Sequence, residues 1–289
     1  MHQHRGSTIA RGLVWSWVRT GEASGDHDVD VVLIHGFQND HSAWGPLVPG
    51  LVRDDRRITA VDLPGCGDSA PPDRWERSTI GELALDLAEI IRAESMREPV
   101  LVGHSLGGAI ALQVALDEPD LASGLVLFAP ASTSGMDFVT DEAAEALAHP
   151  SRDEQLALLR AAFHRPPDPE LLASLEAVVL RADPRHIEGA ARSMRAFVVQ
   201  DRLRAVTTPV VLIAGDRDRH VPVRHHLATW SHLERAGLHV EHGVGHVPFA
   251  EATASTTAVV DHFIDHERRG RRSPTARSER QAGTVAPKN

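Results

Sequence analysis

One stretch of the sequence, residues 99–116, restricts the possible folds more than any other. Its apolar run Val100–Val102 predicts a short buried strand, and the apolar pattern that follows Gly107 predicts a helix. Ser105 lies between the two, where a strand that turns directly into a helix forces the backbone into a strained conformation. The stretch therefore indicates an α/β fold with a serine at the tip of a strand-to-helix turn.

Glycine stands two residues before and two residues after this serine, at Gly103 and Gly107. Neither glycine carries a Cβ that would clash in so tight a turn. The Ser105 hydroxyl would then stand above the sheet at a helix N-terminus, where free N–H groups favour negative charge. We interpret the pattern as a nucleophile elbow. The alternative is a glycine-rich turn with a capping serine.

Strands and helices alternate along most of the chain. Strands are expected near residues 8–19, 30–35, 57–61, 100–102, 124–129, 209–214 and 238–242, and the first of these segments is expected to open an antiparallel hairpin. Such regular alternation predicts right-handed βαβ units and a mostly parallel sheet. A helix over residues 78–96 has a clear apolar stripe, and Thr79 and Glu82 have the spacing of a capping box.

The alternation stops at Pro130 and resumes at Pro209. The intervening residues form short helical patterns separated by prolines, with more apolar side chains than a polar loop would carry. The expected organisation is a core in two parts, 1–131 and 206–267, a helical cap at 132–205, and a tail at 268–289. The last helix is expected to span about 249–266. The tail has no apolar period, so we expect it to be disordered.

Charge and composition disfavour several classes of protein. The net charge is −10, and residues 267–289 hold seven basic and two acidic residues, so the remaining chain is more acidic than the whole. An acidic body binds nucleic acid or an anionic membrane poorly. No apolar run is long enough to cross a bilayer, and the first residues show no signal-peptide pattern. We therefore expect a cytoplasmic protein.

Cysteine and histidine usage predicts neither a disulfide nor a metal site. The single cysteine, Cys66, excludes an internal disulfide and is typical of a reducing compartment. The chain has 18 histidines, but none stands in a His-Glu-x-x-His pattern, so no metal site is expected.

Two further residues complete a possible catalytic set. A serine hydroxyl needs a base within hydrogen-bond reach, and that base needs an acid to orient it. Asp218 and His246 each follow a predicted strand, as Ser105 does, and the carboxyl ends of parallel strands meet at one edge of a sheet. We therefore expect the three side chains to converge there. Asp216 lies at the first bend of its loop, where a carboxylate usually caps the turn.

On these residues the chain resembles the α/β-hydrolase superfamily. The motifs that carry the resemblance are His35-Gly-Phe37, Asp62-Leu-Pro-Gly-x-Gly-x-Ser69, Gly103-His-Ser-Leu-Gly-Gly108, Gly215-Asp-x-Asp218 and Gly245-His246, and they extend over roughly residues 8–266. The resemblance implies an α/β-hydrolase fold with a sheet of the eight-stranded type and a lid between its sixth and seventh strands. Cys66 departs from the histidine that many relatives carry at that place, which we do not expect to affect catalysis.

The resemblance also implies roles for individual residues. The nucleophile would be Ser105, the acid Asp218 and the base His246, and the backbone N–H groups of Phe37 and Leu106 would form the oxyanion hole. Serine at the elbow argues against the epoxide hydrolase and haloalkane dehalogenase branches, which use aspartate there.

Other residues near these motifs are candidates for substrate binding. They are Gly36, Gln38, His104, Phe138, Phe197, Val221 and Val247. Gln38 could instead cap the following helix, and the two phenylalanines could simply pack the cap on the core. His35 and Asp62 are expected to brace their own loops and to take no direct part in catalysis.

These features favour a serine hydrolase that cleaves a small, largely apolar ester, thioester or related acyl compound through an acyl-enzyme, without a cofactor. The same triad would allow hydrolysis of a C–C bond in a diketone-like substrate, cofactor-free perhydrolysis, or cyclisation or acyl transfer in which a substrate group replaces water. A non-catalytic binding protein is a further alternative, which the intact triad disfavours. The sequence leaves the choice between a monomer and a homo-oligomer open.

Overall fold

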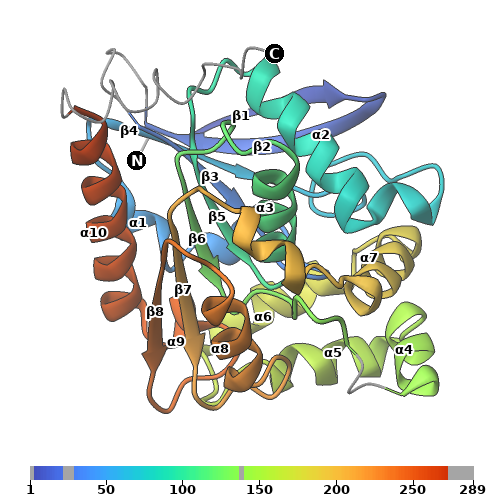
Figure 1. Ribbon diagram of the computed structural model, residues 1–289. Coiled ribbons are helices and arrows are strands. Elements are labelled where there is room, and N and C mark those ends of the chain that lie inside the picture. Colours follow the sequence, from blue (N-terminus) through green and yellow to red (C-terminus); the bar gives the residue numbers. More distant parts are fainter. Residues whose placement is uncertain (1–2, 22–28, 137–139, 273–289) are drawn as a thin grey trace, which may run out of the picture.

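The computed structural model describes residues 3–21, 29–136 and 140–272. Its strands form one eight-stranded sheet in the order β1-β2-β4-β3-β5-β6-β7-β8 (Figure 1). The strands are β1 Gln3–Ala10, β2 Leu13–Thr20, β3 Val29–Ile34, β4 Arg56–Val61, β5 Val100–His104, β6 Gly124–Phe128, β7 Val210–Gly215 and β8 Ala236–Glu241. Strand β2 pairs antiparallel with β1 and β4, and all other pairs are parallel. The predicted mostly parallel sheet is confirmed.

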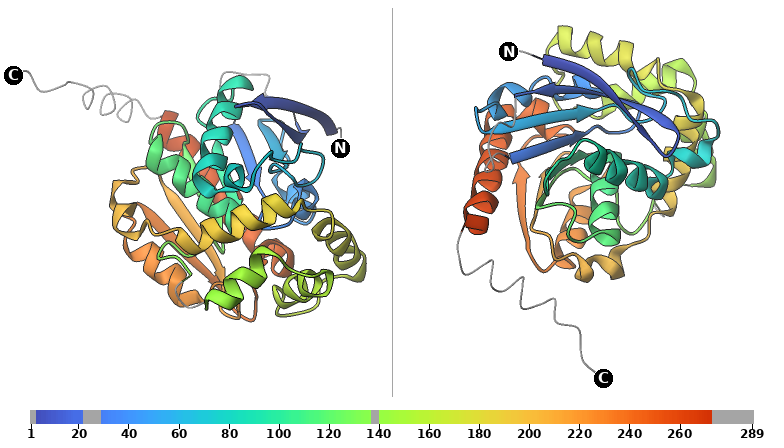
Figure 2. Two further views of the ribbon diagram at one scale, coloured as in Figure 1. Left: turned by 90° about the vertical axis from the view of Figure 1, so that its right-hand side faces the viewer. Right: turned by 90° about the horizontal axis from the view of Figure 1, so that it is seen from above.

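The central strands are buried on both faces, which explains their continuous apolar sequences. In β3, Val32 and Ile34 belong to one core cluster, whereas Val31 and Leu33 belong to the other. The first cluster includes side chains of α2 (Ile80–Ala93) and α3 (Leu106–Asp117). The second includes side chains of α1 (Val48–Leu51) and α10 (Thr253–Arg272). Figure 2 shows α10 on one side of the sheet and α2 and α3 on the other.

The cap region between β6 and β7 is helical over the residues that the structure describes. It contains α4 Asp141–Ala148, α5 Arg152–Ala161, α6 Pro169–Val179, α7 Pro184–Ala196 and the 3-10 helix η3 Gln200–Ala205. Figure 1 shows α4 to α7 together at one end of the sheet. Met194 of α7 packs in the first core cluster, and Leu159 of α5 and Leu175 of α6 pack in the second. The cap is therefore joined to both faces of the core.

Two local expectations were wrong. The Thr79 side chain makes no capping hydrogen bond to α2; instead the Ile80 N–H donates to Ser193 Oγ at 2.8 Å. Glu82 does not return to Thr79, because Arg77 holds its carboxylate at 2.6 Å. An ion pair and a neighbouring helix thus replace the expected capping box.

The C-terminal part of the core also differs from the expected single helix. The short helix α9 (Pro248–Glu251) is separated from α10 by Ala252, whose backbone at φ −134° and ψ 48° leaves the helical region. Helix α10 runs to Arg272, past the expected end near residue 266, and the rest of the predicted tail lies outside the described residues. None of the helices described here combines the length and the apolar character that crossing a bilayer requires.

The remaining short elements connect the core. They are the 3-10 helices η1 His41–Trp44 and η2 Trp75–Ser78, and helix α8 Val223–Ser231 between β7 and β8. Helix α8 ends at Ser231, and β8 begins at Ala236. The loops that matter for the site follow β3, β5, β7 and β8.

Candidate active site

Ser105 occupies the strained turn that the sequence predicts. It stands between β5 and α3 with φ 51° and ψ −111°, outside the regions that non-glycine residues normally adopt. Neighbouring backbone holds it there: the Ser105 N–H donates to Phe128 O at 2.9 Å, and the Ala131 N–H donates to Ser105 O at 3.0 Å. The end of β6 thus fixes the turn from both sides.

Both flanking glycines are required by close backbone contacts. A Cβ on Gly103 would lie 2.3 Å from Gly107 O, and a Cβ on Gly107 would lie 2.1 Å from Ile34 O. Real side chains do not approach backbone so closely. The spacing of glycines around Ser105 therefore follows from the packing of α3 on β3 and β5.

Asp218 and His246 form a buried pair. Asp218 Oδ2 lies 2.7 Å from His246 Nδ1, and the side chains are 0% and 6% exposed. Asp218 Oδ1 accepts hydrogen bonds from the His220 and Val221 N–H groups at 2.8 and 2.9 Å, so the loop after β7 fixes the carboxylate. Burial alone would raise the pKa of Asp218, but the charge and hydrogen bond of His246 and the His226 ring, 3.7 Å away, hold that pKa well below its usual range.

Asp216 lies elsewhere, on the exposed part of the same loop. Its Oδ1 accepts a hydrogen bond from the Gly243 N–H at 2.7 Å, and its Oδ2 lies 2.8 Å from His242 Nδ1. Asp216 therefore ties the loop after β7 to the loop after β8, and Asp218 is the carboxylate that contacts His246.

Two further histidines enclose the His246 ring. The ring centroids of His104 and His220 lie 5.0 and 5.1 Å from that of His246. Each donates from Nε2 to a backbone carbonyl, His104 to His246 O at 2.8 Å and His220 to Leu158 O at 3.0 Å. Burial lowers the pKa of His104 to about 3 and that of His220 to about 4, so both rings stay neutral at pH 7.

His35 braces the loop after β3 that carries Gly36 and Phe37. Its Nδ1 donates to Gly36 O at 2.8 Å, and its Nε2 accepts from the Leu63 N–H at 2.9 Å. Burial lowers the pKa of His35, which fits this neutral tautomer. A Cβ on Gly36 would lie 2.7 Å from His104 Nδ1, so Gly36 allows close packing and does not line the cavity.

The backbone N–H groups of Phe37 and Leu106 remain available at this edge. Leu106 is the first residue of α3, where a helical N–H has no partner within the helix. Among the described residues, neither N–H donates a hydrogen bond to another group.

A cavity of about 440 Å³ brings Ser105 and His246 together. Its wall includes four of the residues expected to bind substrate, which are Gln38, His104, Val221 and Val247. The cap supplies a mostly apolar wall that sequence reasoning missed: Met136, Leu147, Leu158, Leu159, Phe163, Leu171, Leu175, Val179 and Met194. A helical period marks these residues as buried, but does not distinguish a cavity wall from a core contact.

The structure describes only one of the two cap phenylalanines that were expected to bind substrate. Phe197 directly follows the last turn of α7 and does not line the cavity. Its side chain is 6% exposed and packs in the first core cluster. Its assignment to substrate binding was wrong. Phe138 lies outside the described residues.

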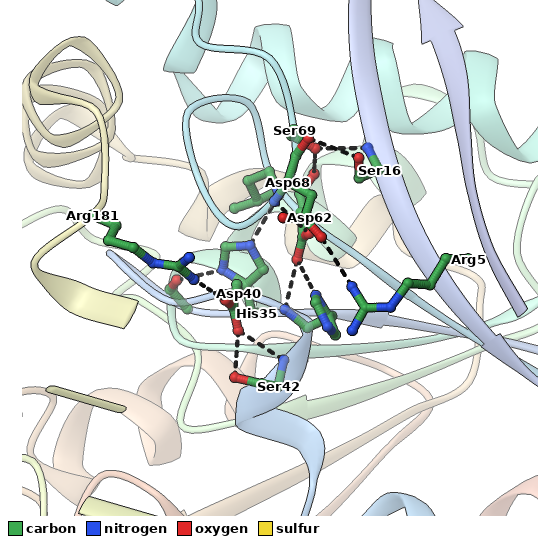
Figure 3. Close-up of polar contacts among 12 residues, drawn as sticks. Arg5, Ser16, His35, Asp40, Ser42, Asp62, Asp68, Ser69 and Arg181 are labelled. Atoms are coloured by element: carbon green, nitrogen blue, oxygen red, sulfur yellow. Dashed lines mark hydrogen bonds and ion pairs between the residues drawn. The ribbon is translucent and has the colours of Figure 1, made fainter. Parts of the chain in front are cut away.

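A polar cluster beside the site has the composition of a metal centre. Ligand atoms of Asp40, His41 and Asp62 lie within 4.8 Å of one another. Figure 3 shows that these carboxylates already have partners. Asp62 Oδ1 accepts from the His41 N–H at 2.7 Å, and Asp40 Oδ1 accepts from the Ser42 N–H at 2.8 Å.

The other oxygens of the two carboxylates are occupied as well. Asp62 Oδ2 accepts from the Asp68 N–H at 3.0 Å, and Asp40 Oδ2 lies 3.4 Å from the guanidinium of Arg181. Asp62 thus braces its own turn, as expected, and the cluster fastens the loops after β3 and β4 to the cap.

Comparison with known proteins agrees with this fold. The model of the alpha/beta hydrolase family matches residues 31–259. The chain belongs to this family. It is 30% identical over 266 residues to a pimeloyl-acyl-carrier-protein methyl ester esterase of Methylococcus capsulatus, covering 81% of this chain and 94% of that one. It is 28% identical over 283 residues to a 2-hydroxymuconate semialdehyde hydrolase of Pseudomonas, covering 89% and 94%.

Solved structures of this α/β-hydrolase family share the fold. An esterase of Exiguobacterium antarcticum superposes with a TM-score of 0.81 at 20% identity, covering 90% of this chain and 98% of that one. A thermophilic esterase of Thermogutta terrifontis superposes with a TM-score of 0.76 at 24% identity, covering 92% and 99%. The protein is therefore an α/β-hydrolase family enzyme with esterase-like relatives.

Proposed function

We propose that the protein is a serine hydrolase of small, largely apolar esters or related acyl compounds, with Ser105 as nucleophile, His246 as base and Asp218 as acid. One observation carries the proposal: Ser105 and His246 line the same cavity, and Asp218 holds the His246 ring at 2.7 Å. Activation of a serine hydroxyl requires a base in the same site and an acid that orients that base.

The reaction would run in two halves. Ser105 Oγ attacks the substrate carbonyl while His246 Nε2 takes its proton, and His246 then gives this proton to the leaving alcohol. The resulting acyl-enzyme is cleaved by water, which His246 activates in the same way. The neutral His104 and His220 rings hold His246 between them and do not compete for its proton at pH 7.

The N–H groups of Phe37 and Leu106 are the proposed oxyanion hole. They come from the loop braced by His35 and from the first turn of α3. Loss of one such donor costs about 2.7–4 kcal/mol in related sites, because the donors are fixed before charge develops on the carbonyl oxygen.

The cavity wall supports an apolar acyl compound as substrate. Helices α5 and α6 and the segment between them contribute leucine, valine and phenylalanine side chains to it, including Leu159, Phe163 and Leu175. A cavity of about 440 Å³ fits a small molecule more readily than a polymer.

Hydrolysis of a C–C bond beside a carbonyl group is the second candidate. One relative that covers 89% of this chain is named for a semialdehyde, which is not an ester. The same triad serves both reactions, since each requires attack at a carbonyl carbon.

The direct test is turnover of chromogenic esters of increasing acyl length by the wild-type protein and by Ser105→Ala. We expect turnover by the wild type, and its loss by at least about 10³-fold in the variant with an unchanged melting temperature. Turnover of a diketone-like substrate without turnover of any ester would favour the second candidate. Equal turnover by both proteins would contradict the role of Ser105.

A further inference from the structure

Charge is distributed unevenly between the cavity and the rest of the protein. The whole chain carries a net charge of −10. Within the described part of the chain, the cavity wall contains no aspartate, glutamate or lysine, and its one arginine is Arg219. The wall histidines His104 and His220 are neutral at pH 7, because burial lowers their pKa to about 3 and about 4. An acidic protein thus presents a cation to its own cavity.

Arg219 lies close to the catalytic pair. It stands between Asp218 and His220 in the loop after β7, and the His220 ring is 5.1 Å from that of His246. Its side chain is exposed, and in the described ranges of the chain it forms no ion pair. Arg217, two residues earlier, lies 3.6 Å from Asp216 and does not line the cavity.

Gln155 is the second polar group in this part of the wall. Of the described residues that α4 to α7 contribute to the wall, it alone has a polar side chain. It is 9% exposed, and its amide makes no hydrogen bond within the described structure. Its amide atoms are not fully buried, so they are accessible to a ligand in the cavity.

A hydrogen bond joins α5, which carries Gln155, to the loop after β7, which carries Arg219. Leu158 follows Gln155 by three residues, which is about one helical turn. The Leu158 carbonyl accepts the hydrogen bond from His220 Nε2 at 3.0 Å, and His220 is the neighbour of Arg219. Helix α5 therefore meets this loop about one turn after Gln155 and one residue after Arg219.

We propose that Arg219 and Gln155 form a subsite for a carboxylate on the substrate, so that the preferred substrate is an ester with an apolar body and a second, ionised end. A guanidinium pairs with a carboxylate through two parallel N–H bonds, and the Gln155 amide offers a further donor. This inference rests on the proposed ester hydrolysis and deepens it.

The experiment compares matched esters that differ in one charge. In the first arm, methyl hexanoate is compared with monomethyl adipate, whose acyl chain ends in a carboxylate. In the second arm, propyl butyrate is compared with the butyrate ester of 3-hydroxypropanoate, which carries the carboxylate on the alcohol. Acid release is followed by pH-stat for the wild type, Arg219→Gln, Arg219→Lys, Gln155→Leu and the control Arg217→Gln.

We expect the wild type to prefer the anionic ester by about tenfold in kcat/KM in at least one arm, since a charged hydrogen bond contributes about 1.5–3 kcal/mol. Arg219→Gln should remove this preference and leave the neutral ester within about twofold, because that ester does not use the cation. Arg219→Lys should keep most of the preference, Gln155→Leu should reduce it by a smaller factor, and Arg217→Gln should keep all of it. Added 0.5 M salt should weaken it, because an exposed ion pair is screened.

Two results would overturn the subsite. One is a preference for the neutral ester in both arms, and the other is an equal loss on both esters in Arg219→Gln, which would indicate a structural role for this residue. Failure of the wild type to hydrolyse any ester would instead contradict the proposed function, so this outcome can be distinguished from failure of the subsite alone.

Discussion

The edge of the sheet that carries Ser105 and the cap that covers it hold their side chains in different ways. At the sheet edge, backbone hydrogen bonds fix each polar group: Asp218 accepts two N–H groups of its own loop, and His35 bridges Gly36 and Leu63. The cap wall consists mostly of aliphatic side chains on helices, held by packing alone. Hydrogen bonds therefore fix the positions of individual catalytic atoms at the sheet edge, whereas the cap determines mainly the volume and the polarity of the cavity.

This difference predicts that chemistry and substrate preference can be changed separately. Substitutions at the sheet edge should lower turnover of every substrate. Substitutions in the cap wall should redistribute rates among substrates, because the cavity changes shape while the triad keeps its geometry.

The largest effect is expected at the acid. Asp218→Asn should lower turnover by roughly 10⁴-fold, because an amide holds the histidine in the wrong tautomer. The matched control is Asp216→Asn in the same loop, which should cost stability more than rate, since Asp216 contacts Gly243 and His242. Steady-state kinetics and thermal melts of the two purified variants check the ranking, and the reverse ranking would show that the acid is assigned to the wrong carboxylate.

A smaller effect is expected in the cap. Leu171→Ala enlarges the cavity from α6, so it should shift the relative rates of long and short acyl esters by roughly tenfold in favour of the longer chain. Leu85→Ala on α2 is the control, because Leu85 is 45% exposed and does not line the cavity. An equal loss on all chain lengths in Leu171→Ala would indicate that this side chain supports the core and leaves substrate choice unaffected.

The last effect concerns stability at acid pH. His186 of α7 is fully buried, both ring nitrogens lack a hydrogen-bond partner among the described residues, and burial lowers its pKa to about 3. Below pH 6.5 the unfolded chain therefore binds a proton that the native ring does not, so stability falls as the pH falls toward 3. Between pH 7.5 and 5.0 this one residue should cost about 2 kcal/mol.

His186→Leu should abolish that part of the loss in urea unfolding at the two pH values, whereas His262→Leu on the exposed face of α10 should not. His104 and His220 act in the same direction at the sheet edge, so some acid sensitivity should remain in His186→Leu. An unchanged pH dependence in His186→Leu would mean that the native protein protonates this ring.

The same contrast explains what the sequence could predict. The elbow, the parallel sheet and the pairing of Asp218 with His246 follow from local patterns, since Ser105, Asp218 and His246 each follow a predicted strand. The cap wall does not, because apolar residues on α5 and α6 look alike whether they face the cavity or the core. Phe197 was misassigned for this reason: its packing depends on where α7 lies, which no local pattern encodes.

The polar contacts that sequence reasoning missed are also tertiary. His226 lies near Asp218 only because α8 folds back on the loop after β7, and Ser193 reaches the start of α2 only through the packing of α7. The capping box predicted at Thr79 does not form, because the Glu82 carboxylate pairs with Arg77 and Arg11 instead.

The central claim is that Ser105 is the nucleophile, and the most direct measurement is the location of a covalent label. A fluorophosphonate reacts with a serine only where a base activates it. After labelling of the wild-type protein, peptide mass spectrometry should find the adduct on the peptide that contains Ser105, and labelling should disappear in His246→Ala. An adduct on another serine, such as the cavity residue Ser132, or no adduct at all would contradict the account.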